Sequence, residues 1–252
     1  MTVGGGGRTT ILLLCSRSDL AARAFAQRWA TRGIVPVTCT DLSRPGWKLE
    51  LSRGVAGVRH ELQAAIDGRH ITGHDIDAVI TRLPFVTESE VDRIHPDDRA
   101  YVAAEMQAFL FAFLSALRCP VVNRATPACL LGPNWRWPEW RRQAIRLDIP
   151  VVDCGISISP GTRCPTWAER LSRTAGAFAS ISVIGQHTVG DVAPELRMYA
   201  LKLARAARLE LLRVWFTGPD GSAHLAGCDL APDLSSDEVG NCLIEHLESA
   251  SC

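Results

Sequence analysis

Short apolar runs that alternate with helix-forming segments constrain the fold of this chain more than any other feature. The first run, residues 11–15, is followed by possible helix caps at Ser18 and Asp19, and then by Gly33, a residue type that often ends helices. A second run, residues 34–40, begins immediately after it. Continuous apolar runs suit strands buried on both faces of a parallel sheet, and a strand–helix–strand unit crosses over right-handed. The sequence therefore predicts an α/β fold.

The rest of the chain divides by its hydrophobic period. Alternation between residues 47 and 72 predicts an antiparallel insertion. The Ser-, Pro-, Gly- and Arg-rich stretch 157–174 predicts a linker or mobile loop, and Pro219-Asp220-Gly221 predicts a hairpin turn. The other expected strands are 76–83, 119–122, 149–152, 179–184, 209–216 and 224–230, and the other expected helices are 97–118, 139–147, 193–207 and 236–248.

Composition excludes several classes of function. The 27 basic and 27 acidic residues balance, so no global field draws the chain to nucleic acid or to an anionic membrane. The nine cysteines are odd in number and form no C-x-x-C pair, which favours free thiols in a reducing compartment. The apolar stretches are shorter than the ~20 residues that a membrane helix needs. We expect a soluble cytoplasmic protein without nucleic-acid or membrane partners.

Known catalytic and metal patterns are missing from the sequence. The turn after the first strand, residues 16–19, lacks the G-x-G-x-x-G of a dinucleotide site. His70 and His74 have helical ligand spacing, but Gly73 between them argues against a helix there. Neither a G-x-S-x-G elbow nor an activating loop around a cysteine occurs. We therefore predict no catalytic residue and no metal site.

The order of segments resembles a known family. Residues 101–152 contain a long helix with Glu105, a strand ending in Asn123-Arg124 (VVNRATPACLLGP), a tryptophan-rich loop, and a helix leading to D-I-P-V. The earlier AVITRLP places Arg82 at the end of a strand. This order is similar to that of the ATP-grasp carboxylate–amine ligases that mature ribosomal peptides. The resemblance covers residues 10–155 well and residues 179–248 more weakly.

The resemblance implies a fold and a domain organisation. Residues 10–155 would form a pre-ATP-grasp domain, Rossmann-like with a mostly parallel sheet. Residues 156–178 would be a linker or mobile loop. Residues 179–250 would be a truncated remnant of the C-terminal α+β half of the ATP-grasp domain.

The resemblance also shows what this chain lacks. Ligases of this family hold the nucleotide phosphates with lysines and the Mg²⁺ ions with acidic side chains, whereas Lys48 and Lys202 are the only lysines here. The family carries an acid on the strand matching 209–216, which has none here, and a Glu-x-Asn on the next strand, where this chain has Gly227 and Asp229. One carboxylate cannot hold two octahedral Mg²⁺ ions. We expect neither ATP nor Mg²⁺ to bind.

Candidate binding residues gather in two places. Arg82 and Asn123-Arg124 end neighbouring strands, at the edge where parallel sheets bind ligands, and guanidinium groups there could clamp a carboxylate or phosphate. Alternatively, Arg82, Glu105 and Arg124 form a buried ion-pair network. The second place is the loop 131–140, whose tryptophans and arginines are typical of interfaces, unless the tryptophans close a core. The full set is Arg82, Glu105, Asn123, Arg124, Asn134, Trp135 and Arg136.

The chain keeps the family's order of segments but lacks the residues that bind the nucleotide, which predicts a pseudoenzyme. It would act as an accessory or scaffold subunit that binds a peptide substrate, or a complete ATP-grasp ligase, in a peptide or natural-product modification pathway. It could also form a homodimer. The alternative is a repurposed or split ligase that forms amide or ester bonds at a site completed in trans by a second chain.

Overall fold

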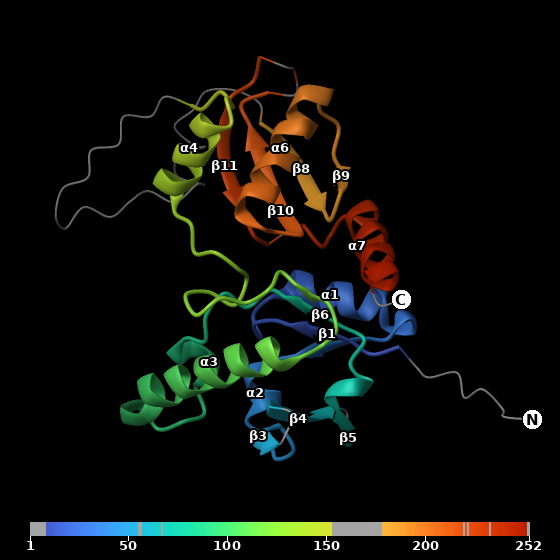
Figure 1. Cartoon of the computed structure of the whole chain (residues 1–252), viewed down its shortest axis with the longest axis vertical. Coiled ribbons are helices and arrows are strands. Elements are labelled where there is room, and N and C mark those ends of the chain that lie inside the picture. The colour runs from blue at the N-terminus through green and yellow to red at the C-terminus, as the bar shows by residue number, and fades with distance from the viewer. Residues whose placement is uncertain are drawn as a thin grey trace, which may run out of the picture. The chain divides into compact units, whose positions relative to one another are not determined.

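The computed structural model describes residues 9–54, 57–66, 68–152, 178–218, 220, 222–231 and 233–250. The chain forms two compact units, an N-terminal unit of Met1–Pro133 with Ile244–Cys252 and a C-terminal unit of Asn134–Leu243 (Figure 1). Trp137 and Trp140 belong to the C-terminal unit and pack into its core. The expected loop 157–174 lies outside the described residues.

A four-stranded parallel sheet organises the N-terminal unit. Its strands β1 (Ile11–Leu14), β2 (Ile34–Val37), β6 (Ala78–Thr81) and β7 (Val121–Val122) follow the order β2-β1-β6-β7. Helix α1 (Leu20–Arg28) connects β1 to β2 and begins after Asp19, whose carboxylate accepts a hydrogen bond from the Ala22 N–H at 2.9 Å. The parallel α/β opening and the cap at Asp19 are thereby confirmed.

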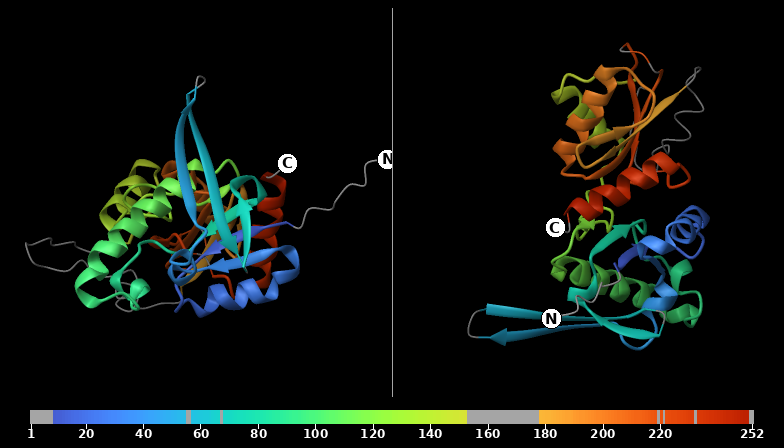
Figure 2. Two further views of the ribbon diagram at one scale, coloured as in Figure 1. Left: turned by 90° about the horizontal axis from the view of Figure 1, so that it is seen from below. Right: turned by 90° about the vertical axis from the view of Figure 1, so that its right-hand side faces the viewer.

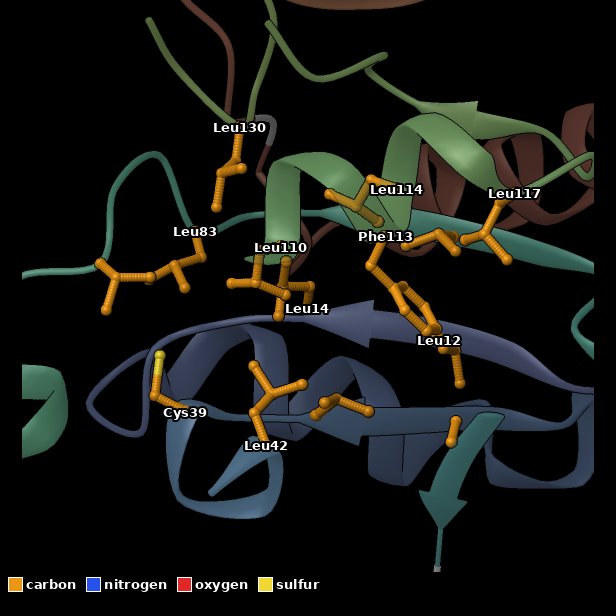
Figure 3. Packing of buried hydrophobic residues seen from close by; sticks show 14 of the residues in the cluster. Leu12, Leu14, Cys39, Leu42, Leu83, Leu110, Phe113, Leu114, Leu117 and Leu130 are labelled. Carbon is orange, nitrogen blue, oxygen red and sulfur yellow. The ribbon is translucent and has the colours of Figure 1, made fainter. Parts of the chain in front are cut away.

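Helix α3 (Arg99–Ala116) supplies most of the remaining core of this unit. Leu110 and Phe113 of α3 point toward Leu14 and Leu12 of β1 (Figure 3), and all four side chains are buried. At roughly 2 kcal/mol for each large apolar side chain removed from water, this contact is a major stabilising element of the unit. The predicted helix 97–118 is confirmed, with its first turn formed by η4 (Pro96–Asp98).

The predicted antiparallel insertion is a three-stranded sheet in the order β3-β4-β5, formed by β3 (Lys48–Gly54), β4 (Gly57–Ile66) and β5 (Arg69–Thr72). Figure 2 shows β3 and β4, in light blue, extending as a hairpin from the rest of the unit. The inner end of β4 is anchored because Leu62, Ala64 and Ile66 are buried in the core with α3.

Short helices account for one difference from the sequence prediction. The strand expected over residues 34–40 ends at Val37, because the Thr38 hydroxyl and backbone N–H both donate to the Asp41 carboxylate and start α2 (Cys39–Leu42). The other short helices of this unit are η1 (Ala30–Arg32), η2 (Gly73–Asp75) and η3 (Glu88–Val91).

The C-terminal unit is built on a four-stranded antiparallel sheet in the order β11-β10-β8-β9. Its strands are β8 (Ala179–Ile184), β9 (His187–Val189), β10 (Leu211–Phe216) and β11 (Leu225–Asp229). The helices are α4 (Trp137–Arg146), α6 (Pro194–Ala207) and α7 (Asp237–Ala250), the last of which continues into the residues grouped with the N-terminal unit. The predicted pairing of β10 with β11 is confirmed.

The strand expected over residues 149–152 is reduced to one parallel bridge, between Val151 and Leu225. Strand β9 was not predicted from the sequence, because three mostly polar residues are too few to show a period in hydrophobicity. In the segments that the structure describes, no helix has the length and apolar character needed to cross a membrane.

Candidate functional site

The carboxyl edge of the parallel sheet holds a largely buried ion pair. Arg82, which follows β6, donates from its backbone N–H to the Leu14 carbonyl at 2.8 Å and from Nε to Asp19 Oδ2 at 2.8 Å. The side chains of Arg82 and Asp19 are only 11% and 17% exposed. The carboxylate that caps α1 therefore also neutralises Arg82, which is held by the protein's own acid rather than presented to a ligand.

The other candidates of this unit lie apart from that pair. Glu105 on α3 and Arg124 after β7 are both exposed. The hypothesis of a buried network joining Arg82, Glu105 and Arg124 is therefore wrong, and the buried partner of Arg82 is Asp19. Asp19 was identified from the sequence only as a helix cap, because nothing local links it to a residue 63 positions away.

Asn123 is a buried residue, with 2% of its surface exposed. The Thr81 hydroxyl at the end of β6 lies 3.1 Å from the Val122 carbonyl and 3.2 Å from the Asn123 carbonyl. This hydroxyl is itself buried and ties the ends of β6 and β7 together. Asn123 is therefore part of the interior at this edge, while the adjacent Arg124 reaches the surface.

Two further polar contacts connect the turn after β1 to the segment that contains η3. Ser16 Oγ donates to Glu90 Oε1 at 2.6 Å, and Arg17 Nη2 donates to Asp92 Oδ2 at 2.5 Å. Burial, reinforced by neighbouring carboxylates, raises the pKa of the Cys15 thiol to about 12. Burial likewise raises the pKa of Cys39 to about 12. Thiols with such a pKa stay protonated near neutral pH and are poor nucleophiles.

The tryptophan loop belongs to the C-terminal unit, where its residues divide between surface and core. Asn134 and Arg136 are exposed, whereas Trp137 and Trp140 are 4% exposed and lie in the core of that unit. Trp135 is half-buried, with its ring 4.9 Å from that of Trp140 in an edge-to-face arrangement. The core interpretation therefore holds for Trp137 and Trp140. The remaining candidates, Asn134, Trp135 and Arg136, reach the surface to different degrees.

Arg213 on β10 is the centre of a polar group that sequence analysis did not select. In the register of β10 with β11, Arg213 lies directly opposite Asp229. Arg213 Nη1 is 3.7 Å from Asp233 Oδ2, and Nη2 donates to Ser180 Oγ at 3.2 Å. The guanidinium carbon also lies 4.8 Å from the ring centre of Trp215. The sequence signal that could have found this group is an arginine in an otherwise apolar strand, LLRVWF.

Solved structures that resemble the whole chain include a ligase and a macrocyclase that were each solved with a precursor. The ATP-grasp ligase PsnB, complexed with a phosphomimetic variant of a minimal precursor, Mg and ADP, superimposes with a TM-score of 0.64, covering 100% of this chain and 99% of PsnB at 15% identity. The chain has the ATP-grasp fold. The macrocyclase MdnC of Microcystis aeruginosa MRC, bound with precursor peptide MdnA, gives a TM-score of 0.62 at 10% identity, covering 96% of this chain and 100% of MdnC.

A further structure, the macrocyclase MdnB of the same organism, gives a TM-score of 0.59 at 14% identity and covers 95% of this chain and 99% of MdnB. No protein-family model matches the sequence, and a search of curated proteins finds no match. At these identities the likeness establishes the fold alone. It confirms the resemblance that the order of segments predicted.

The ATP-grasp fold raises the question of whether this chain fits ATP and Mg²⁺. On the paired strands β10 and β11, the residue opposite Asp229 in the register is Arg213 rather than an acid. In the described part of the chain, no three His, Cys, Asp or Glu side chains are close enough together to hold a metal ion. Lys48 pairs with Glu50 on β3, and Lys202 lies half-buried on α6. Among the residues that the structure describes, Asp229 with an arginine opposite it is a poor match for a Mg²⁺–nucleotide site, which combines one or two carboxylates with fixed positive charge on the phosphates.

Proposed function

We propose that this chain is a non-catalytic ATP-grasp-fold protein. It serves as an accessory or scaffold subunit that binds a precursor peptide, or an active ATP-grasp ligase, in a peptide or natural-product modification pathway. The parallel-sheet unit would correspond to a Rossmann-like pre-ATP-grasp domain, and residues 179–250 to a shortened C-terminal half. Peptide binding is supported by the fold that the chain shares with PsnB and MdnC, both of which were crystallised with precursor peptides.

The pairing of Arg213 with Asp229 carries the non-catalytic part of the proposal. Arg213 lies opposite Asp229, so its positive charge repels a divalent cation near this carboxylate. An ion that bridges nucleotide phosphates is therefore disfavoured there. Phosphoryl transfer depends on metal ions and fixed positive charge that neutralise the phosphate oxygens. A chain that keeps the fold but reverses a charge on this face retains a binding scaffold without that chemistry.

Nucleotide binding tests this part directly. Calorimetric titration of ATP with Mg²⁺ into the purified chain is expected to give no binding heat up to millimolar nucleotide. Asp229→Ala, which removes the strand carboxylate, should behave like the unmodified chain. Micromolar binding that is lost in Asp229→Ala would overturn the proposal, because it would show a working metal–nucleotide site on β11.

Partner binding is tested in the source cell and then with purified components. The affinity-tagged chain should enrich one peptide precursor or one complete ATP-grasp ligase, and the same pair should form a complex when both are purified and mixed. The complex should form equally well with and without ATP. A chain that stays monomeric and binds neither class of partner in the reconstituted mixture would refute the scaffold role.

The alternative function, a split or repurposed ligase, makes a different prediction in the same mixture. Amide or ester formation would then require both chains and ATP, and would stop when either chain is omitted. The Arg82–Asp19 pair disfavours a catalytic site at the carboxyl edge of the parallel sheet, because the candidate substrate clamp is already bound to an internal carboxylate.

A further inference from the structure

The β3–β4 hairpin extends from the N-terminal unit as an arm (Figure 2). Within the part of the chain that the structure describes, β3 pairs with β4 and with no other strand, whereas β4 lies between β3 and β5. Along its outer edge, β3 therefore presents backbone N–H and C=O groups to no strand among those described. Seven residues make this edge long enough to pair with a strand of another chain.

This edge has few of the features that block pairing between chains. Edge strands are commonly protected by prolines, bulges or free charges. Strand β3 contains no proline, and its register with β4 is continuous. Its only lysine, Lys48, is paired with Glu50 on the same face of the strand. Leu51 has 66% of its surface exposed, so a partner strand would remove apolar surface from water.

A second copy of this chain is a partner whose strand can be compared with β3 residue by residue. In an antiparallel pair, directly opposite residues point to the same face of the sheet. A two-fold axis makes the contact isologous, so residue i of one copy faces residue j of the other and j faces i. Because faces alternate along a strand, i and j must both be even or both be odd. Few registers meet this condition, and side-chain chemistry separates them.

Charge and apolar contact favour the register that places Leu49 on the two-fold axis. In this register Lys48 of each copy faces Glu50 of the other, which forms two ion pairs between side chains that are 52% and 51% exposed. On the opposite face, Leu51 of each copy faces Trp47 of the other. Trp47 and Leu49 pack against the core of the N-terminal unit, so the incoming Leu51 would extend that core.

The neighbouring registers are less favourable. With Glu50 on the axis, the two Glu50 carboxylates face each other, and like charges directly opposite are destabilising. With Leu51 on the axis, Leu49 faces Arg53 and no two opposite charges face each other. The register with Leu49 on the axis also leaves Arg53 beyond the short paired segment.

We propose that β3 is a self-association edge, through which two copies of this chain join their antiparallel sheets into one continuous sheet with Leu49 on the two-fold axis. The contact is small, so we expect a dissociation constant of about 10⁻⁶–10⁻⁴ M. This interface does not depend on whether the chain binds a peptide or a ligase.

Sedimentation velocity of the full-length chain over a range of concentrations tests the two ion pairs. Lys48→Glu changes both pairs at once because of the symmetry, and it should weaken self-association at least tenfold. Glu50→Lys should do the same. The double variant Lys48→Glu with Glu50→Lys restores opposite charges across the axis and should regain the original affinity to within about threefold. All three should melt like the unmodified chain at low concentration, because both side chains are half exposed.

Single cysteine substitutions at successive positions test the register. A residue on the axis faces its own copy with Cα atoms about 4.5–5.5 Å apart, within the disulfide range of about 4.4–6.8 Å. Leu49→Cys should therefore form a disulfide-linked dimer under mild oxidation, with the linkage at position 49 identified by mass spectrometry. Glu50→Cys and Leu51→Cys are the matched controls and should link poorly. The unmodified chain, with nine cysteines of its own, gives the background.

Three results would overturn the proposal. The first is an unmodified chain that stays monomeric at concentrations of about 10⁻⁴ M and above. The second is self-association that Lys48→Glu leaves unchanged, which would place the interface elsewhere. The third is cross-linking that is stronger at position 50 or 51 than at position 49. A monomeric chain that binds a peptide along β3 also counts against it, because the edge would then serve a different partner. The charge variants keep the test decisive if Leu49→Cys does not fold.

Discussion

Asp19 serves two elements at once: one carboxylate oxygen caps α1 and the other accepts from Arg82 Nε at 2.8 Å. The pair joins the start of the first helix to the end of β6 across 63 residues of sequence. A side chain with two such roles fixes the carboxyl edge of the parallel sheet. The edge is therefore a structural junction in this chain.

Replacement of Asp19 should separate its two roles. Asp19→Ala removes the cap and leaves Arg82 nearly buried without this acid, so we expect a loss of about 3 kcal/mol in the free energy of unfolding. Asp19→Asn keeps a capping oxygen and should lose less. Urea unfolding followed by circular dichroism measures both. A loss below about 0.5 kcal/mol for Asp19→Ala would show that the pair is not a junction.

Gly33 and Gly68 form a matched pair for a backbone test. Both have positive φ, +79° and +74°, but a Cβ at Gly33 would lie 1.8 Å from the Thr9 carbonyl oxygen, whereas at Gly68 nothing lies within 4 Å. Gly68→Ala should cost about 1 kcal/mol from the left-handed conformation alone. Gly33→Ala adds a clash with the backbone and should cost at least twice as much, as measured by thermal unfolding. Equal losses would mean that the Thr9 segment moves freely.

The buried thiols of Cys15 and Cys39 predict a dependence of stability on pH. The pKa of each is raised from 9.0 to about 12 by burial, so above pH 9 the unfolded chain releases these protons while the folded chain retains them. Stability should therefore fall as pH rises, by about 1 kcal/mol per thiol between pH 9 and pH 10. A Cys15→Ala, Cys39→Ala double variant should have the shallower slope. Identical slopes would contradict burial of the thiols.

Trp135 and Trp140 should differ in their effect on the C-terminal unit. Trp140 is 4% exposed in the core, so Trp140→Ala should cost about 3–5 kcal/mol of stability. Trp135 contributes mainly its edge-to-face contact, and Trp135→Ala should cost about 1 kcal/mol. The unfolding should be followed in denaturant by far-UV circular dichroism, because replacing a tryptophan changes the fluorescence signal itself. A larger loss for Trp135→Ala would reverse the assignment of core and surface.

The exposed arginines provide the functional prediction. Charge reversal by Arg124→Glu or Arg136→Glu should leave the melting temperature within error, because both side chains are exposed. Under the proposed scaffold role, at least one of the two should weaken binding of the peptide or ligase partner about tenfold. Arg146→Glu, on the exposed side of α4, is the control. If all three variants bind alike, the partner surface lies elsewhere.

Sequence periodicity predicted the elements whose signals are local. Apolar runs predicted β1, β6 and β8, the turn residues Pro219-Asp220-Gly221 predicted the pairing of β10 with β11, and the stripe along α3 predicted the long helix. Periodicity did not predict contacts between residues that are far apart in the sequence. Asp19 was recognised as a cap, but its contact with Arg82 depends on the sheet order, and Arg213 was recognised only as a missing acid. Thr38 with Asp41 started α2 within an apolar run because two side-chain hydrogen bonds outweighed strand propensity.

Val151 and Ala179 lie in one row across the sheet of the C-terminal unit. Val151 bridges Leu225, Leu225 pairs with Phe216, and Phe216 pairs with Ala179, so three strand spacings, roughly 14 Å, separate the two anchor points. The entropy of closing a loop grows only by about 0.6 kcal/mol for each doubling of its length. A change in the number of residues between these two anchors should therefore cost little stability as long as the sheet keeps its register.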